Sequence, residues 1–431
     1  MPESLQAVLD DRWTERPSSA SAEPAAVELA IYDDLAAVER IWLELEQKAD
    51  CTVFQTFDWL AAWQRHIGDQ NNVAPAIVVG RGGNGEALFV LPLAVWPGLV
   101  RRLTWLGSDL CDYNAPLLAA GFADRAAAAR FSALWDEICK MLQHRPRHRH
   151  DVVELTKMPE RIGGQVNPML MLDLALNPSR AHIATLGGSW DQFYRARRSP
   201  ASRRRDRSKR RGLAQCGEVR LVTPKEPREV TRTLETLFVQ KAKTFARMGV
   251  PNIFERPGYR EFFFALALNP ATSRLVHVSR LDVGCVPAAA NLGLIFRDTY
   301  YHVLASYDDG ELSRYGPGAA HLRDLLSHAI NLGCRRFDFT IGDEPYKLAW
   351  SDSTSDLYDC IAAATARGWP LAALILARAH LQRTIKRDAR LWHSFTRLRS
   401  ALGSRSVSTR GSEHSSNAGE QTGTSGAGKP K

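Results

Sequence analysis

The clearest candidate for chemistry is a glycine-containing loop that stands directly before a helical pattern. Residues 313–318 read Ser-Arg-Tyr-Gly-Pro-Gly and follow a strand-like segment at 299–306. Apolar residues then recur every three or four positions as far as Gly333, which suits a helix end. In a strand–loop–helix arrangement, free backbone N–H groups and the helix dipole attract an anion such as a phosphate. An ordinary strand-to-helix turn is the alternative, because glycine and proline mark turns of every kind.

A second group of reactive side chains follows the next predicted strand, residues 335–340. The strand contains one carboxylate, Asp338, and the loop after it is polar and aromatic. The chemistry-bearing residues of this loop are Gly342, Asp343, Glu344, Tyr346, Lys347 and Trp350. The two loops therefore enclose one helix and one strand, and the rest of the chain must position them.

This region, residues 312–350, resembles the signature of the acetyltransferase-like domain of CelD-type proteins, which are associated with cellulose biosynthesis. That family belongs to the GNAT superfamily and is similar to the FemAB peptidyltransferases. The positions that carry the resemblance are Tyr315 to Gly318, Gly333, Asp338-Phe339, Gly342, Tyr346-Lys347 and Trp350. In layout the resemblance extends over residues 27–365, but its motifs are dense only in the second half. Arg314 and Gly318 fill part of the GNAT pyrophosphate loop, at a spacing that departs from the usual one.

The resemblance implies an acyltransferase that moves an acetyl or other acyl group from acyl-CoA to an amine or hydroxyl, without a metal. On this interpretation the donor's pyrophosphate is held by Arg314, Tyr315, Gly316, Gly318 and Ala319. The catalytic candidates are Asp338, first as general base, then Glu344 and Lys347. The alternative for Asp338 is a structural carboxylate that fixes the following loop.

The acceptor side is assigned by the same resemblance. Tyr346 and Trp350 are its substrate-binding candidates, together with Phe57 and Trp59 from the segment 54–59, which resembles a recurring phrase of the family. For Phe57 and Trp59 an aromatic core at the start of a helix is an equally good interpretation. The acceptor is a small molecule, a glycan or a peptide, in the setting of exopolysaccharide or cell-envelope synthesis.

Two other functions compete with this one. A FemAB-like aminoacyl transfer from charged tRNA to a cell-wall peptide would also use two domains, and only in that case do we expect nucleic acid as a partner. A non-catalytic scaffold of a polysaccharide-synthesis complex is the third candidate. Binding of acyl-CoA, salt-sensitive binding of tRNA, or neither would distinguish the three.

The composition indicates a globular protein of two domains. The chain has 431 residues, of which 45% are hydrophobic and 24% charged. No apolar run reaches the ~18–20 residues needed to cross a bilayer, and the polar first residues lack the apolar core of a signal peptide. Seven scattered cysteines form no Cys-x-x-Cys pair, which argues against structural zinc and disulfides. We therefore expect a cytoplasmic protein.

The net charge of +9 is concentrated in two elements. Residues 195–212 contain ten basic residues and one acidic residue. A solvated helical face is the first interpretation of this run, and a phosphate-rich partner is the second. Residues 366–402 are the other basic element, and 369–402 has the pattern of an amphipathic helix. Such a helix packs on the protein itself or binds a synthase complex or the inner membrane face.

The two halves of the chain repeat the same order of predicted elements. In each half a strand hairpin, a third strand, a loop, a helix and a further strand follow one another. The sequence thus predicts an α/β (α+β) fold of tandem GNAT-like domains, with mixed, mostly antiparallel sheets flanked by helices. The expected division is a disordered N-terminus at 1–26, a degenerate domain at 27–175, a donor-binding domain at 176–365, the basic amphipathic helix at 366–402 and a disordered tail at 403–431.

Overall fold

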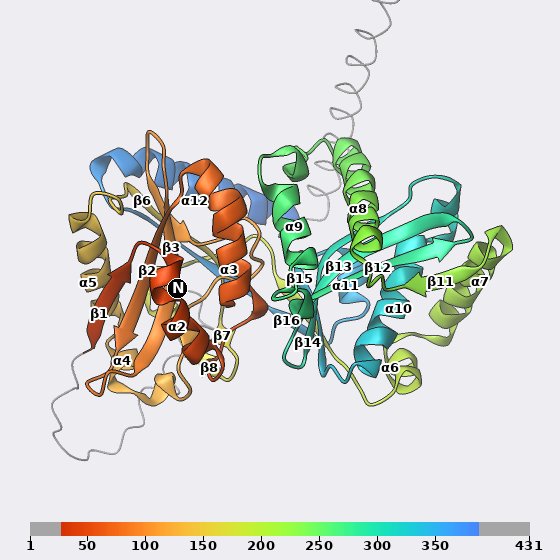
Figure 1. Cartoon of the computed structure of the whole chain (residues 1–431), viewed down its shortest axis with the longest axis horizontal. Helices are drawn as coiled ribbons and strands as arrows, with labels where there is room; N and C mark the ends of the chain where they lie inside the picture. The colour runs from red at the N-terminus through yellow and green to blue at the C-terminus, as the bar shows by residue number, and fades with distance from the viewer. Residues whose placement is uncertain (1–26, 388–431) are drawn as a thin grey trace, which may run out of the picture.

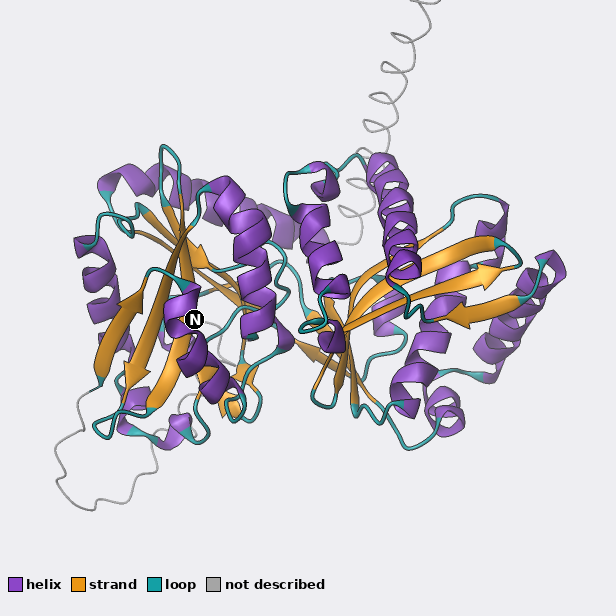
Figure 2. Cartoon of the chain, in the orientation of Figure 1, coloured by secondary structure: helices purple, strands orange, loops and turns teal. Residues whose placement is uncertain are grey.

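The computed structural model describes residues 27–387, which form two lobes, each built on one large β-sheet (Figures 1 and 2). The disorder expected for residues 1–26 and 403–431, and the helix expected for 388–402, fall outside the described residues. Helices cover the sheets in both lobes, as Figure 2 shows. Among the residues described, none of the helices combines the length and apolarity that crossing a bilayer requires.

The first sheet has the strand order β1-β2-β3-β4-β6-β17-β9, with the short β5 paired to β3. Neighbouring strands are antiparallel except β4 and β6, which are parallel. The bounds are β1 (Glu28–Tyr32), β2 (Ala74–Arg81), β3 (Ala87–Trp96), β4 (Arg102–Trp105), β5 (Leu117–Leu118), β6 (Val152–Pro159), β9 (Ala175–Leu176) and β17 (Leu357–Ala363).

The second sheet repeats this plan in the order β11-β12-β13-β14-β15-β10-β16. Its one parallel pair, β14 and β15, occupies the same place as β4 and β6 in the first sheet. The bounds are β10 (Ala181–Thr185), β11 (Val219–Val222), β12 (Val276–Val283), β13 (Val286–Phe296), β14 (Thr299–Tyr307), β15 (Arg336–Ile341) and β16 (Ser353–Ser355). A separate small hairpin joins β7 (Arg161–Ile162) and β8 (Gln165–Val166).

One strand of the predicted second domain joins the first lobe. β17 lies within the predicted domain at 176–365, but it pairs with β6 and β9 of the first sheet. β10, near the start of that domain, takes the place beside β15 that β17 takes beside β6. A division of the chain at a single residue therefore does not describe the sheets. Strand periodicity gives the existence of β17 but not its partner, because pairing depends on which sheet edge it meets.

The helices are amphipathic where they cover a sheet. In α2 the buried residues Leu35, Val38, Trp42 and Leu45 recur at helical spacing, and the Asp34 carboxylate accepts a hydrogen bond from Ala36 N at 3.0 Å. The bounds are α2 (Leu35–Glu46), α3 (Phe57–Trp63), α4 (Ala126–Ala129), α5 (Phe131–His144), α6 (Trp190–Arg197), α7 (Pro200–Cys216), α8 (Pro227–Met248), α9 (Tyr259–Leu268), α10 (Pro317–Asn331), α11 (Pro345–Leu348) and α12 (Trp369–Arg387).

The lobes share one apolar core at their junction. α3 of the first lobe packs against α9 of the second, where the Trp59 and Phe262 rings meet edge to face at 4.9 Å. The Tyr259 hydroxyl donates to the Asp109 carboxylate across the same junction. A continuous core of this kind holds the two sheets in a defined relation, so side chains of one lobe can complete a site in the other.

The basic helix α12, blue in Figure 1, packs on β17 and β6 of the first sheet. Ala372 is buried there, and the Arg383 guanidinium donates to Leu176 O at 3.2 Å. Its outer side leaves Trp369, Leu374 and Leu381 exposed. Packing on the protein itself, one of the alternatives from the sequence, thus occupies one face of α12 and leaves the apolar outer side uncovered.

Candidate active site

The second sheet opens into a fork between its two parallel strands. β14 and β15 pair as far as Tyr301 and Asp338. Beyond this point β14 continues to pair with β13, and β15 pairs with β10. From Tyr301 to the end of β14 at Tyr307 the strand extends by about 20 Å. The fork therefore has Asp338 at its closed end, and its open end leads to the glycine loop.

Asp338 is buried, with 3% of its surface exposed. Its Oδ1 accepts hydrogen bonds from the Tyr113 hydroxyl at 2.7 Å and from Thr340 N at 2.7 Å. Thr340 adopts a left-handed backbone with φ of 60°, which turns its N–H toward the carboxylate two residues earlier. Burial raises the pKa of Asp338 to about 7, although both hydrogen bonds favour the ionised form. A carboxyl group with this pKa can accept and return a proton near neutral pH.

A loop of the first lobe completes the fork. It supplies Tyr113, and it also supplies Asp112, whose carboxylate hydrogen-bonds the Thr340 side chain. Burial raises the pKa of Asp112, and the Asp112 carboxylate in turn raises the pKa of Asp338. Neither Asp112 nor Tyr113 was among the site candidates from the sequence.

Lys347 lies on the far side of the fork, on the short helix α11. Its Nζ donates to Ile341 O at 2.6 Å and pairs with Glu344 at 3.2 Å. Lys347 is 5% exposed, whereas the Glu344 side chain is 55% exposed. The ammonium lowers the pKa of Asp338 and locks the loop that follows β15. Of the three catalytic candidates, Asp338 and Lys347 are thus buried together, and Glu344 reaches solvent.

Two further residues near the fork were not among the site candidates named from the sequence. His302 is the next residue of β14 after the last parallel pair, and burial lowers its pKa to about 3, so the imidazole is neutral. Its ring lies 6.5 Å from that of Tyr346, a predicted substrate contact. Lys241 of α8 interacts electrostatically with Glu344 and Lys347, and burial lowers its pKa. Neither residue belongs to a motif, so no local signal could have found them.

The predicted phosphate loop ends at the start of α10. Gly316 caps the helix in a left-handed conformation with φ of 64°, and Pro317 takes the first helical position. A helix that starts this way leaves the N–H groups of Gly318 and Ala319 without intrahelical partners. Just before them, the Arg314 guanidinium stacks on the Tyr315 ring at 4.8 Å. The five predicted donor residues therefore lie together at the open end of the fork.

The basic helix α7 adds an ammonium to this loop. A Cβ built on Gly316 would lie 3.3 Å from Lys209 Nζ, and one built on Gly212 would clash with the Tyr315 ring at 2.4 Å. The absence of a side chain at Gly212 therefore lets α7 press against the loop. Lys209 has no hydrogen-bond or ion-pair partner within the described chain. The sequence treated residues 195–212 as one charged run and did not single out this lysine.

Three predicted substrate contacts lie elsewhere. Trp350 is 5% exposed and stacks on Trp190 and Phe193, at the other face of β15. Phe57 and Trp59 are 8% and 1% exposed, in the core shared by the lobes. These rings have no free face for a substrate, so the contacts support packing rather than the role expected from the sequence. Tyr346, by contrast, is 41% exposed beside the fork.

The site contains no cluster of metal ligands. Across residues 27–387, histidine, cysteine, aspartate and glutamate side chains form no group of three or more that could hold an ion. The groups that the fork offers are a buried carboxyl, an ammonium, a phenol and backbone amides. Such groups suit proton transfer and the binding of a phosphate-bearing donor.

Comparisons with known proteins agree with this geometry. Residues 200–348, from the start of α7 to the end of α11, match the family model described as an acetyltransferase (GNAT) domain. A search of curated proteins finds no match. Among solved structures the chain is similar to one titled crystal structure of FemX, at 10% identity with a TM-score of 0.54, over 81% of this chain and 99% of that one.

Two other solved structures are similar at lower scores. One is L-PGS from Bacillus licheniformis, at 11% identity and a TM-score of 0.48, over 80% of this chain and 97% of that one. The other is a tandem GNAT protein from the clavulanic acid biosynthesis pathway, at 14% identity and a TM-score of 0.43, over 79% and 99%. The strand order repeated in the two sheets and the likeness to FemX show the predicted tandem α/β architecture, and the match of residues 200–348 to an acetyltransferase (GNAT) domain supports an acyltransferase.

Proposed function

We propose that the protein transfers an acyl group from acyl-CoA to an amine or hydroxyl acceptor at the fork of the second sheet. The observation that carries this proposal is the pairing of a buried carboxyl at the closed end with a glycine loop and free amides at the open end. A donor with phosphates at one end and a thioester at the other matches a fork about 20 Å long.

The donor's pyrophosphate would lie on the amides of Gly318 and Ala319, with Lys209 and Arg314 as nearby cations. The acyl arm would extend between β14 and β15 toward Asp338. Hydrogen bonds from backbone amides to the phosphates are charge-assisted and add to the helix dipole. The loop thereby fixes the donor without any metal ligand.

Asp338 then acts as general base. Its ionised carboxylate takes a proton from the acceptor while the acceptor's lone pair attacks the thioester carbonyl. The tetrahedral intermediate collapses, the carbon–sulfur bond breaks, and the proton held on Asp338 is available to the leaving sulfur. Lys347 and the Tyr113 hydroxyl are positioning groups that hold Asp338 and lower its pKa toward neutrality.

The experiment is calorimetric titration of the full chain with acetyl-CoA and longer acyl-CoAs, followed by acyl transfer to a panel of amines and sugars. Binding with release of free CoA in the presence of an acceptor supports the proposal. If the protein binds none of these donors, the proposal is wrong.

A second candidate is aminoacyl transfer from charged tRNA to a cell-wall peptide. The basic helix α7 beside the donor loop favours it, because tRNA phosphates would need cations there. Salt-sensitive binding of aminoacyl-tRNA without acyl-CoA binding would select this candidate. If neither donor binds, a scaffold role in a polysaccharide-synthesis complex remains.

The CelD-type resemblance suggests the setting. We propose a cytoplasmic enzyme of exopolysaccharide, cellulose or cell-envelope synthesis, held at the inner membrane face or on a synthase through α12. The exposed Trp369, Leu374 and Leu381 among its basic residues support this location.

A further inference from the structure

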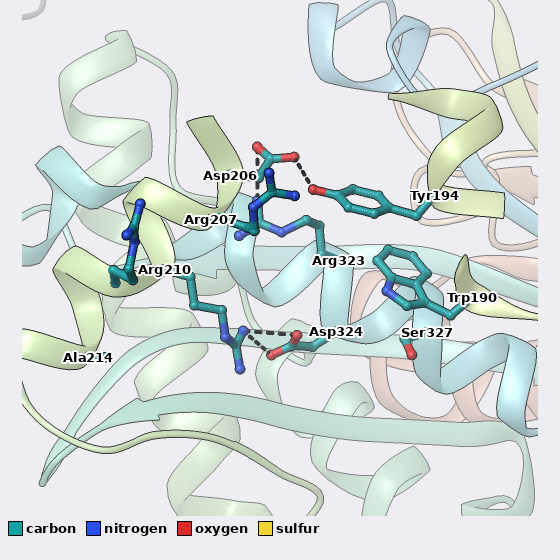
Figure 3. A pocket seen from close by; sticks show the side chains of 10 residues that line it. Trp190, Tyr194, Asp206, Arg207, Arg210, Ala214, Arg323, Asp324 and Ser327 are labelled. Atoms are coloured by element: carbon teal, nitrogen blue, oxygen red, sulfur yellow. Dashed lines mark hydrogen bonds and ion pairs between the residues drawn. The ribbon is translucent and has the colours of Figure 1, made fainter. Parts of the chain in front are cut away.

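A hollow of about 690 Å³ lies between α6, α7 and α10, on the outside of the second lobe (Figure 3). None of the fork residues Tyr113, Asp338 and Lys347 lines it. Its walls come from the basic helix α7 on one side and the middle turns of α10 on the other. The proposed acyl transfer makes no use of it.

The floor of the hollow is a set of paired charges. Asp206 is 7% exposed and accepts bonds from the Tyr194 hydroxyl at 2.9 Å and from Arg198 at 3.2 Å, and it pairs with Arg323 at 3.3 Å. Arg210 binds both oxygens of Asp324, at 3.0 and 2.8 Å. These groups are satisfied, so they fix the shape of the hollow and leave it no net charge.

The α7 wall adds two arginines that have no such partners. Arg207 and Arg211 line the hollow one helical turn apart. Within the described chain neither guanidinium has a hydrogen bond or an ion pair. The hollow therefore contains four arginines and two aspartates, an excess of two positive charges.

An aromatic plate forms the α6 end of the hollow. The Trp190 indole stacks on the Tyr194 ring at 4.9 Å with 15° between the planes, and on the Trp350 ring at 6.3 Å. These contacts fix the orientation of Trp190, which is half-buried and lines the hollow. Ser327 lies beside it, as Figure 3 shows.

We propose that this hollow is a binding site for a free nucleoside di- or triphosphate. Its phosphates would lie between Arg207 and Arg211, which can each form paired hydrogen bonds to phosphate oxygens. Its base would stack on Trp190, a contact open to any base because every base has a π-face. The hollow is open on its outer side, so a nucleotide can enter from solvent, and the indole of Trp190 at one end is large enough to stack one base. This site is separate from the acyl donor's fork and does not depend on the proposed function.

The test is titration of the full-length protein with ADP in the absence of acyl-CoA, because acyl-CoA itself carries an adenosine diphosphate. The variant Gly318→Asp, which blocks the proposed donor loop, should bind ADP as the wild type does. We expect ADP to bind with one site per chain. The double variant Arg207→Gln/Arg211→Gln should lose at least about tenfold in ADP affinity, because both charge-assisted contacts are removed. Arg205→Gln is the matched control, since Arg205 is exposed on α7 but does not line the hollow.

The base contact is tested with Trp190→Leu and Trp190→Phe. The leucine variant should weaken ADP binding and leave the affinity for inorganic pyrophosphate unchanged, whereas the phenylalanine variant keeps a ring and retains most of the ADP affinity. A thermal melt of each variant checks that the aromatic stack survives.

Three results would overturn the proposal: no ADP binding at millimolar concentration, loss of ADP binding in Gly318→Asp, or equal losses in the Arg205 control and the double variant. Loss of anionic-vesicle binding in the double variant, without any nucleotide binding, would also overturn it. If the protein binds ADP at this site but never binds acyl-CoA, the acyl-transfer function is refuted and the nucleotide site is not.

Discussion

Each sheet forks after its pair of parallel strands, but different side chains line the two forks. In the first sheet β4 and β6 pair in parallel as far as Thr104 and Glu154. The fork beyond them is a small hollow of about 280 Å³, lined by Trp96, Arg102, Lys157 and their neighbours. In the second sheet the corresponding register position holds Asp338, and the fork leads to the glycine loop.

What closes the first fork is a lysine. Lys157 takes a left-handed backbone with φ of 59°, as Thr340 does in the second fork at 60°. Its Nζ donates to Ser108 O at 2.8 Å and to Cys111 O at 2.7 Å. The loop after β4 is thereby tied across its own fork, and its next residues, Asp112 and Tyr113, reach the other one. The first copy of the fold thus supplies side chains to the site of the second.

The largest expected effect concerns Asp338 and Glu154, the carboxylates at the last parallel pair of each sheet. We expect Asp338→Asn to lower kcat/KM about 10²–10⁴-fold, as removal of a general base does. Asparagine keeps the shape and the acceptor oxygen, so the thermal midpoint should change little. The measurement is acyl transfer under first-order conditions.

The matched control for this variant is Glu154→Gln at the equivalent position of the first fork, where activity should stay within a few-fold of wild type. Equal losses in the two variants would mean that the forks are not functionally distinct.

The second largest effect concerns the glycine loop at the start of α10. Gly318→Asp should weaken acyl-CoA binding at least about tenfold, because its carboxylate would face the donor's pyrophosphate. Gly318→Ala is the control. A Cβ at this position meets only the exposed Tyr307 ring, at 3.1 Å, which can yield. Unchanged affinity in the aspartate variant, measured by calorimetry, would exclude this loop as the donor site.

A smaller effect tests the contribution of the first lobe to the second fork. If Asp338 is the base, activity requires its ionised form and rises with pH through a midpoint near its pKa of about 7. The Tyr113 hydroxyl stabilises that ionised form, so Tyr113→Phe should raise the pKa and move the midpoint upward by about 1–2 pH units. A pH–rate profile that does not move would show that Tyr113 has only a packing role.

Through the Asp338 carboxyl, a rise in pH increases activity but decreases stability. Asp338 has a pKa of 3.8 before perturbation and a higher one in the folded protein. Between these values the folded state holds a proton that the unfolded state has lost. This carboxyl therefore contributes most to stability at low pH, and the contribution decreases as the pH rises toward 7.

The smallest expected effect is on the outer side of α12, which packs only its inner side on the first sheet. Leu374 and Leu381 are 64% and 59% exposed. Replacing both with glutamate should leave the thermal midpoint nearly unchanged and weaken binding to anionic vesicles. Ala372→Glu is the contrasting variant, because Ala372 is buried against the sheet and this change should destabilise the fold. If the wild-type chain does not bind vesicles, α12 serves only to pack on the first lobe.

Much of the local structure could be predicted from the sequence. The bounds of β14 and β15 agree within one residue with the strands predicted at 299–306 and 335–340. The helix start at Pro317 and the strand that carries Asp338 also followed from the order of glycine, proline and periodic apolar residues. These features depend on residues close together in the chain, so their propensities and spacing are sufficient.

The composition of the site was decided by the tertiary structure. Tyr113 reaches Asp338 across 225 positions of sequence. Lys209 meets Gly316 because Gly212 lets two helices approach closely. Trp350 matches the motif, yet it turns away from the fork into the stack with Trp190. Such contacts depend on which sheet a strand joins and which face a side chain takes. The pairing of β17 with the first sheet has the same origin, since a strand's pattern indicates that it pairs but not with which edge.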